Sequence, residues 1–215
     1  MRATTVLFDA FGTLIKIRGG VHPYRKIMRI GMEQGRKPSP TDAESLLSTP
    51  LNLIEAANHF GIKVPQTVMA DLEACLQEEL DCLEAYEDGL KAVSMLQAEG
   101  VPVGICSNLA KPYASAVERL YPSVLMRAYS FEAGAIKPSP EMFGYASAVM
   151  GAKFPGDIAV IGDSPRCDRD GARAYGMEGY LLCRVGRGDY CSLVDFAHDI
   201  ISASASLAGH GPVNP

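Results

Sequence analysis

The chain has 215 residues, 47% of them hydrophobic and 21% charged, which is the composition of a globular protein with one main core. These values exclude wholesale disorder and a large multidomain assembly. The 20 basic and 25 acidic residues give a net charge of -5, so no basic field exists for nucleic acid or anionic lipid. We therefore expect a small anionic molecule as substrate, and neither nucleic acid nor a membrane as partner.

The six cysteines are scattered along the chain and contain no CxxC pair. This spacing argues against a disulfide framework and against a zinc site. The N-terminus lacks the long apolar stretch of a signal peptide, and no apolar run approaches the length of a membrane span. We therefore expect reduced thiols in a cytoplasmic protein.

Three short apolar runs end at polar residues, a pattern typical of buried strands in a parallel sheet. The runs cover residues 4–8, 101–106 and 158–161, and they precede Asp9, Ser107 and Gly162-Asp163. Weaker strand patterns cover 128–131 and 179–183, and helical patterns separate the strands. This alternation predicts an α/β fold with a Rossmann-like parallel sheet of about five strands. Ligands bind outside the carboxyl ends of such strands, which is where these polar residues fall.

Residues 15–85 interrupt the alternation, because they show helical patterns without a strand between Ile17 and Tyr86. We expect them to form a small α-helical cap inserted into a core made of 1–14 and 86–208, with 209–215 as a disordered tail. The longest cap helix is expected over 66–83, with leucines on one side. The acidic residues of its other side are expected to face solvent, namely Asp71, Glu73, Glu78, Glu79 and Asp81.

Four short motifs follow one another at the ends of the expected strands. They are Phe8-Asp9-Ala10-Phe11-Gly12-Thr13-Leu14, Ser107-Asn108, Lys137-Pro138-x-Pro140 and Gly162-Asp163-Ser164-x-x-x-Asp168. Each motif alone is weak, but together and in this order they resemble the haloacid dehalogenase superfamily over the whole expected core. Most members of that superfamily are Mg²⁺-dependent phosphatases, and a smaller branch cleaves carbon–halogen bonds.

The resemblance implies catalytic roles for the first and third motifs. Asp9 would be a nucleophile that forms an aspartyl-enzyme intermediate. Free backbone N–H groups in the following turn, helped by the Thr13 hydroxyl, would bind a developing oxyanion. Lys137 would keep Asp9 ionised, and Asp168 would orient Lys137 or a metal-bound water.

The resemblance also implies a substrate contact and a metal site. Ser107 would donate to an anionic oxygen, with Asn108 supporting it. Asp9, Asp163 and a backbone carbonyl near Phe11 would offer the oxygen ligands that Mg²⁺ prefers.

Each motif also has a purely structural explanation. Asp9 and Thr13 fit ordinary turn chemistry after a strand, and Lys137 fits a solvated loop lysine. Ser107 or Asn108 fits the N-cap of the next helix. The joint occurrence of the four motifs favours a functional site over these local explanations.

The first motif departs from the phosphatase pattern at one position. Phosphatases of the superfamily usually carry a second Asp two residues after the nucleophile, which protonates the leaving group and later activates water. This chain has Phe11 there, so a proton-transfer step worth roughly 10²- to 10⁴-fold is absent or supplied elsewhere. Dehalogenases need no such acid because halide is a good leaving group, and the sequence FDAFGTL resembles their first motif.

The fourth motif favours the phosphatases. Dehalogenases have Ser where this chain has Asp163 and Asn where it has Pro165, and they need no metal. Asp163 retains a Mg²⁺ ligand, and its charge would repel the carboxylate of a haloacid. We therefore expect a Mg²⁺-dependent phosphatase of a small phosphorylated metabolite. The alternatives are a metal-independent 2-haloacid dehalogenase and a catalytically silent relative that binds a ligand or partner.

A phosphatase without this acid needs a substrate with an acidic leaving group, such as an aryl or acyl phosphate, or a proton donor from the cap. The candidate donors are His22, Tyr24, Arg25, Arg29 and His59. Tyr24 and Arg25 head an expected helix close after the catalytic loop, so they are candidate cap contacts to the substrate. Alternatively, Tyr24 packs in the core of the cap while Arg25 and Arg29 face solvent.

Overall fold

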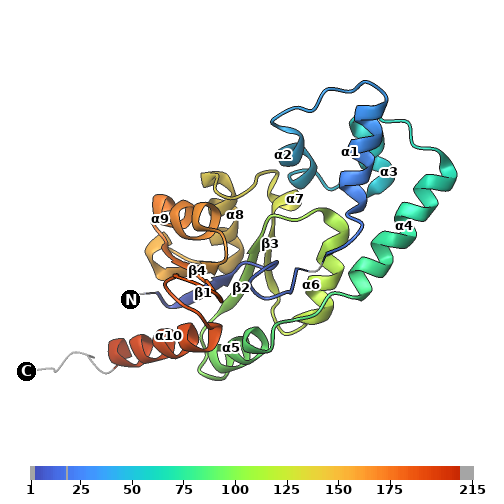
Figure 1. The fold of residues 1–215 in the computed structure, drawn as a ribbon. Helices are drawn as coiled ribbons and strands as arrows, with labels where there is room; N and C mark the ends of the chain where they lie inside the picture. The colour runs from blue at the N-terminus through green and yellow to red at the C-terminus, as the bar shows by residue number, and fades with distance from the viewer. Residues whose placement is uncertain (1–2, 18, 209–215) are drawn as a thin grey trace, which may run out of the picture.

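The computed structural model describes residues 3–17 and 19–208 of the chain. Its centre is a parallel sheet of five strands in the order β3-β2-β1-β4-β5 (Figure 1). The strands are β1 (Thr5–Phe8), β2 (Val103–Ser107), β3 (Met126–Tyr129), β4 (Ile158–Gly162) and β5 (Glu178–Leu181). This sheet confirms the predicted Rossmann-like α/β fold.

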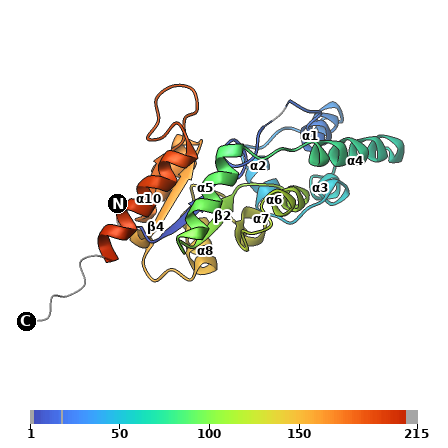
Figure 2. The ribbon, with the colours of Figure 1, turned by 90° about the horizontal axis from the view of Figure 1, so that it is seen from below.

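Alternate residues of the central strands supply two hydrophobic clusters, one on each face of the sheet. Val6 and Phe8 of β1 belong to the cluster that contains Leu96 of α5 (Glu87–Ala98) and Phe196 of α10 (Leu193–Ala208). Figure 2 shows α5 and α10 side by side over this face. Leu7 points to the other face. Its cluster includes buried residues of α8 (Pro140–Met150) and α9 (Gly171–Tyr175).

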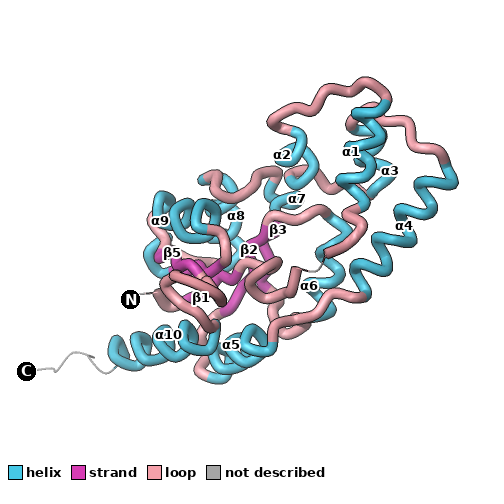
Figure 3. Tube along the Cα trace, in the orientation of Figure 1, coloured by secondary structure: helices cyan, strands magenta, loops and turns pink. Residues whose placement is uncertain are grey.

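An all-helical insertion separates β1 from α5 (Figure 3). Its helices are α1 (Pro23–Glu33), α2 (Asp42–Leu47), α3 (Leu53–His59) and α4 (Gln66–Asp81). The two ends of the insertion run beside each other, since Lys16 N donates to Glu84 O at 2.9 Å and Tyr86 N to Leu14 O at 2.8 Å. This pairing lies at the limits that we propose for the cap, residues 15 and 85.

The predicted strand at 128–131 is wrong in its second half. β3 ends at Tyr129, and Ser130–Ala133 form the short helix α7. The Ser130 hydroxyl donates to Leu47 O of the insertion at 2.6 Å and accepts from Leu109 N at 3.1 Å. These contacts to distant parts of the chain take the place of a further strand pairing.

The remaining elements complete the layers around the sheet. The last strand is β5 at Glu178–Leu181, not 179–183 as predicted. The other helical segments are α6 (Ala114–Leu120), η1 (Lys111–Tyr113), η2 (Pro155–Asp157) and η3 (Pro165–Asp170). The six cysteines are free thiols. No helix in the described part of the chain is long and apolar enough to cross a bilayer, and the tail predicted over 209–215 lies outside the described residues.

The contrast between a buried and an exposed leucine tests this arrangement of the core. Leu7 is fully buried in the central strand, whereas Leu125 is 79% exposed. We expect Leu7→Ala to lower the free energy of unfolding by about 2–5 kcal/mol, because it leaves a cavity beneath α8. Leu125→Ala should change it by less than about 0.5 kcal/mol. Urea denaturation measures both values, and equal effects would contradict the assigned position of β1.

Candidate active site

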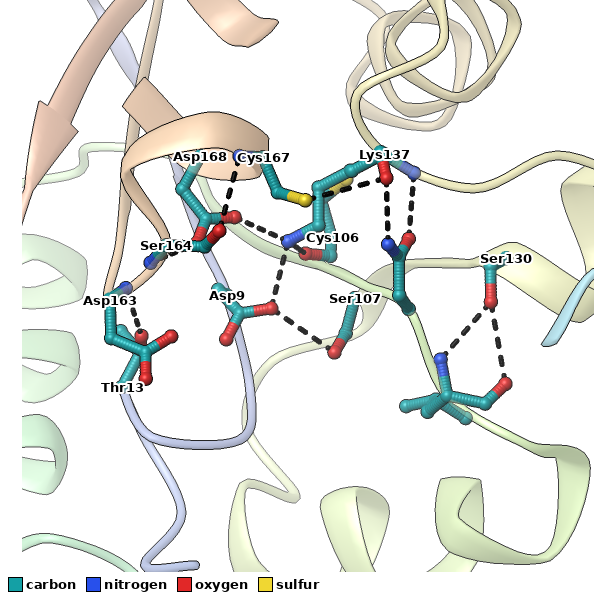
Figure 4. A network of polar contacts seen from close by, with 12 residues as sticks. Asp9, Thr13, Cys106, Ser107, Ser130, Lys137, Asp163, Ser164, Cys167 and Asp168 are labelled. Atoms are coloured by element: carbon teal, nitrogen blue, oxygen red, sulfur yellow. Dashed lines mark hydrogen bonds and ion pairs between the residues drawn. The ribbon is translucent and has the colours of Figure 1, made fainter. Parts of the chain in front are cut away.

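The motif residues meet where the strand order reverses. β1 lies between β2 and β4, so the carboxyl ends of these three strands are neighbours. Asp9 follows β1, Ser107 ends β2 and Asp163 follows β4. The reversal point of an open parallel sheet is where such folds bind ligands. Figure 4 shows the resulting network of polar side chains.

Lys137 forms the centre of this network (Figure 4). Its ammonium donates to Asp9 Oδ1 at 2.8 Å, Asp168 Oδ1 at 2.6 Å and Cys106 O at 2.7 Å. The residue is only 2% exposed, so these three acceptors replace the water that its three protons would otherwise bind. Burial alone would lower the pKa of Lys137, but the carboxylates of Asp168 and Asp9 raise it well above the usual range. Lys137 therefore remains a cation.

The backbone of Lys137 is held by Asn108. Asn108 Nδ2 donates to Lys137 O at 2.9 Å, and Lys137 N donates to Asn108 Oδ1 at 2.7 Å. Cys167 Sγ adds a contact to the same carbonyl at 3.5 Å. We expected Asn108 to support Ser107; its side chain instead fixes the loop that carries Lys137.

Asp9 is buried at the end of β1 and has one oxygen free of hydrogen bonds from the described residues. Oδ1 accepts from Lys137 and from Ser107 Oγ, the latter at 3.2 Å, so Oδ2 is left for a ligand. Burial raises the pKa of Asp9 to about 6; Lys137 lowers it and Asp168 raises it. Asp9 is therefore mostly ionised at neutral pH. By contrast, burial raises the pKa of the neighbouring Cys106 thiol to about 12, which keeps that thiol protonated.

The catalytic loop also holds Asp163. Thr13 is fully buried, and its hydroxyl accepts from Asp163 N at 3.1 Å. Gly12 has φ +88°, and a Cβ there would lie 2.1 Å from Asp163 Oδ2, so only glycine allows this approach. The Gly12 N–H donates to Ile15 O at 2.8 Å, so it is not one of the free N–H groups of this turn; the expected oxyanion binding by the other N–H groups of the turn stays a prediction. Thr13 thus positions Asp163 in this structure.

Asp168 is held from two sides. Oδ1 accepts from Lys137, and Oδ2 accepts from Ser164 N at 2.9 Å. A Cβ at Gly162 would lie 2.2 Å from Asp168 Cγ, which explains the glycine in the fourth motif. Both carboxylate oxygens of Asp168 are therefore engaged, and of the two expected roles the geometry fits the orientation of Lys137.

Three carboxylates cluster at this point. Ligand atoms of Asp9, Asp163 and Asp168 all lie within 4.8 Å of one another. Desolvation and the nearby Asp168 raise the pKa of Asp163, and Lys137 lowers it less. The negative charge thus exceeds what Lys137 neutralises. Asp9 Oδ2 and the Asp163 carboxylate fit a divalent cation, whereas the oxygens of Asp168 are already bonded.

Four of the five candidate proton donors of the cap line one cleft, and the fifth, His59, does not. Tyr24 is buried and donates to Leu51 O at 2.9 Å, whereas Arg25 and Arg29 are exposed. Together with His22, these residues line an open cleft that also reaches Phe11. His59 is absent from the described lining, and its Nε2 lies 2.8 Å from Ser45 Oγ. The structure brings none of the five into a hydrogen bond with Asp9 among the described contacts.

Two contacts near the site have no signal in the sequence. Arg184 Nη2 donates to Thr13 O at 2.7 Å, and its Nη1 to Asp88 Oδ2 at 2.5 Å, so it ties the catalytic loop to α5. Glu79 was expected to face solvent, but its Oε1 accepts from Tyr113 OH at 2.9 Å. The sequence shows Glu79 only as one of several acidic residues on α4, which is why its position was mispredicted.

Comparison with known proteins places the chain in a family. A family model of haloacid dehalogenase-like hydrolases matches residues 3–176. The chain belongs to the haloacid dehalogenase-like hydrolases, as its motifs suggested. A search of curated proteins found no match.

Solved structures of both chemical branches share the fold. A HAD phosphatase from Thermococcus onnurineus is 20% identical with a TM-score of 0.61, over 93% of this chain and 98% of that chain. The L-2-haloacid dehalogenase from Xanthobacter autotrophicus is 16% identical with a TM-score of 0.59, over 99% and 85%. A HAD family enzyme from Bacteroides thetaiotaomicron, in complex with magnesium and inorganic phosphate, is 17% identical with a TM-score of 0.56, over 86% and 96%. At these identities the similarity shows a common fold.

Removal of the central cation tests the electrostatics of the site. We expect Lys137→Met to lower the free energy of unfolding by about 3–5 kcal/mol near pH 8, because two buried carboxylates lose their cation. The loss should be smaller at pH 5. Without Lys137 the pKa of Asp9 rises further above its unfolded value, so protonation of the folded state offsets the lost cation at low pH. Urea denaturation at both pH values measures this difference.

Ser107→Ala is the matched control, because it removes an uncharged donor from the same Asp9 oxygen. It should lower the free energy of unfolding by about 1 kcal/mol, with little dependence on pH. Equal losses for Lys137→Met at pH 5 and pH 8 would contradict the assigned ion pairs.

Metal binding gives a second test, independent of activity. Mg²⁺ added to EDTA-treated protein should raise the Tm, since a ligand at about 100 times its Kd stabilises the folded state by about 2.7 kcal/mol. The rise should shrink from pH 7.5 to pH 5, because Asp9, with its pKa of about 6, is then protonated. Asp163→Asn should reduce it, whereas Asp71→Asn on the exposed side of α4 should not. Calorimetry that shows no rise for the unmodified protein would contradict a metal site here.

Proposed function

We propose that this chain is a Mg²⁺-dependent phosphatase of small phosphorylated molecules, with Asp9 as the nucleophile. The observation that carries the proposal is the position of Asp163 beside Asp9 and Asp168, within 4.8 Å. Three carboxylates facing one ammonium repel an anionic substrate unless a divalent cation is added. The magnesium and inorganic phosphate named for the relative from Bacteroides thetaiotaomicron support this choice.

The residues that would hold the metal are Asp9 through Oδ2, Asp163 through its carboxylate, and a backbone carbonyl near Phe11. Bound Mg²⁺ neutralises the charge of a phosphoryl group and polarises its oxygens. Thr13 and Gly12 serve this arrangement indirectly, because they hold Asp163 against the catalytic loop. Asp168 serves it through Lys137.

The first chemical step needs an ionised Asp9. Lys137 lowers the pKa of Asp9, so its carboxylate is available at neutral pH in spite of its burial. An oxygen of Asp9 forms a bond to phosphorus, and the bond between phosphorus and the leaving oxygen breaks with its electron pair on that oxygen. Ser107 Oγ donates its one proton to Asp9 Oδ1, so it would have to turn from Asp9 toward the substrate to donate to a phosphoryl oxygen.

The second step returns the enzyme to its starting state. A water oxygen bonds to phosphorus, the Asp9 carboxylate is displaced with the electron pair of its bond to phosphorus, and the proton of the water passes to an oxygen of the inorganic phosphate that leaves. Phe11 offers neither an acid for the first step nor a base for this one. The rate of the first step therefore depends on the leaving group, and the rate of the second depends on the reactivity of water at the site.

Phe11 is the observation that favours a dehalogenase instead. An aromatic ring at this position cannot transfer a proton, and a halide needs no proton in order to leave. We rank the dehalogenase second for two reasons. The charge of Asp163, close to Asp9, would repel the carboxylate of a haloacid. In addition, Arg25 and Arg29 make no described contact with Asp9. A silent binding protein ranks third, since a binder needs no buried lysine between two carboxylates.

Hydrolysis of p-nitrophenyl phosphate tests the proposal. Nitrophenolate leaves without a general acid, so the assay does not penalise Phe11. We expect activity with Mg²⁺, its loss in EDTA, and a fall of at least about 10³-fold in Asp9→Asn, because the nucleophile is removed. Phe11→Asp should raise kcat where the second step limits the rate, since it restores a base that can take the proton of the attacking water.

Other outcomes would select the alternatives. Release of halide from 2-chloropropionate without metal, together with no phosphate release, would establish the dehalogenase. Turnover of p-nitrophenyl phosphate that is unchanged in Asp9→Asn would overturn the assigned nucleophile. The absence of either reaction in all variants would point to the binding protein.

A further inference from the structure

A large open cleft lies between the insertion and the core, directly beside the catalytic loop. Its volume is about 1030 Å³, and it is lined by residues of α1, α2 and α4 together with Phe11, Asn108 and Tyr113. Phe11 is two residues from Asp9, and Asn108 holds the backbone of Lys137. The cleft therefore borders the catalytic loop, and a group attached to a phosphoryl group at Asp9 can extend into it.

The lining of the cleft is mainly apolar. Three of its large hydrophobic side chains are exposed, namely Ile17 at 65%, Val21 at 42% and Met32 at 47%. Exposed apolar side chains that gather in a cleft are typical of a binding site, because a ligand removes them from water. Their contact area favours a bulky apolar ligand over a sugar or other polyol.

Two aromatic rings of the lining meet beside the catalytic loop. Phe11 and Tyr113 meet edge to face, with ring centroids 5.7 Å apart at 88°. Tyr113 is also fixed at its other end by the hydrogen bond from its hydroxyl to Glu79 of α4. The second oxygen of Glu79 is buried without a hydrogen-bond partner among the described residues, so holding Tyr113 is the visible role of this carboxylate. The result is an aromatic surface, held by the bond to Glu79, that begins at Phe11 of the catalytic loop.

We propose that this cleft receives an aromatic leaving group, so that the substrates are aryl phosphates whose rings pack on Phe11 and Tyr113. The inference rests on the proposed phosphatase function and names its substrate class. Rings pack favourably against other rings at such distances. A phenol, with a pKa of about 10, also leaves as its anion far more readily than an alkyl alcohol. The aryloxide takes the electron pair of the broken bond and later gains a proton from water, which requires no acid at position 11.

A series of three phosphates separates ring packing from leaving-group acidity. Phenyl phosphate and 1-naphthyl phosphate have leaving groups of similar acidity but different apolar area. Acetyl phosphate has a more acidic leaving group and no ring. We expect KM to be about five- to tenfold lower for 1-naphthyl than for phenyl phosphate, because the second ring is buried. We also expect kcat/KM to be at least about tenfold higher for 1-naphthyl than for acetyl phosphate.

Variants of cleft residues test whether the cleft causes the preference for 1-naphthyl phosphate. Tyr113→Ala should raise KM for 1-naphthyl phosphate about tenfold, and its loss of kcat/KM should be larger for that substrate than for acetyl phosphate. Glu79→Gln should also raise the KM for 1-naphthyl phosphate, but by less, because Tyr113 is then held by a weaker acceptor. Val21→Ser, at an exposed position on the cleft, is the second variant should Tyr113→Ala fold poorly. Phe154→Ala is the matched control, since it removes an exposed ring outside the described lining.

These measurements distinguish a failure of the aryl phosphate inference from a failure of the proposed phosphatase function. Turnover of acetyl phosphate with equal or higher KM for the naphthyl than for the phenyl ester would overturn the aryl inference alone. So would a Tyr113→Ala loss that is equal for all three substrates. If the unmodified protein hydrolyses none of them with Mg²⁺, the proposed phosphatase and this inference both fail.

Discussion

The buried ammonium of Lys137 is the interaction on which the rest of the site depends. Its three acceptors come from different parts of the sheet edge: Asp9 after β1, Cys106 on β2 and Asp168 in η3. Removing an ammonium from water is costly, and three acceptors with two negative charges offset that cost only when all are in place. The same contacts that make the burial tolerable therefore fix the distances between strand ends. They also keep Asp9 ionised, so stability and reactivity have a common origin.

Much of the fold could be predicted because its signals are local. A β-branched or apolar run that ends at a polar residue identifies a buried strand and its exit, and this holds for Asp9, Ser107 and Asp163. The alternation of Val6, Leu7 and Phe8 between two faces follows from the twofold period of any strand. Once the strands are parallel, their carboxyl ends must share one edge. The proximity of the motif residues then needs no further information.

The features that escaped prediction depend on contacts between distant residues. Phe131 continues the apolar pattern of the strand before it, but Ser130 forms hydrogen bonds to Leu47 and Leu109, and the chain turns into α7. Arg184 reaches Thr13 across 171 positions, and Tyr113 reaches Glu79 across 34. A single sequence shows that such residues are charged or aromatic. It does not show which partner the folded chain brings to them.

Phe11 and Asp163 concern two different charges of the proposed reaction, the charge of the phosphoryl group and the charge on the leaving oxygen. The phosphoryl charge is the same for every phosphate ester, so a phosphatase retains the Asp163 carboxylate for its metal whatever the leaving group. The charge on the leaving oxygen depends on the leaving group, and an aryl group stabilises that charge without a proton from position 11. Phe11 replaces the proton donor and at the same time meets Tyr113 to form the aromatic surface. A first motif like that of the dehalogenases and a fourth motif like that of the phosphatases are therefore compatible in one enzyme. In the proposed reaction the first motif concerns the bond to the leaving group, and the fourth concerns the charge of the phosphoryl group.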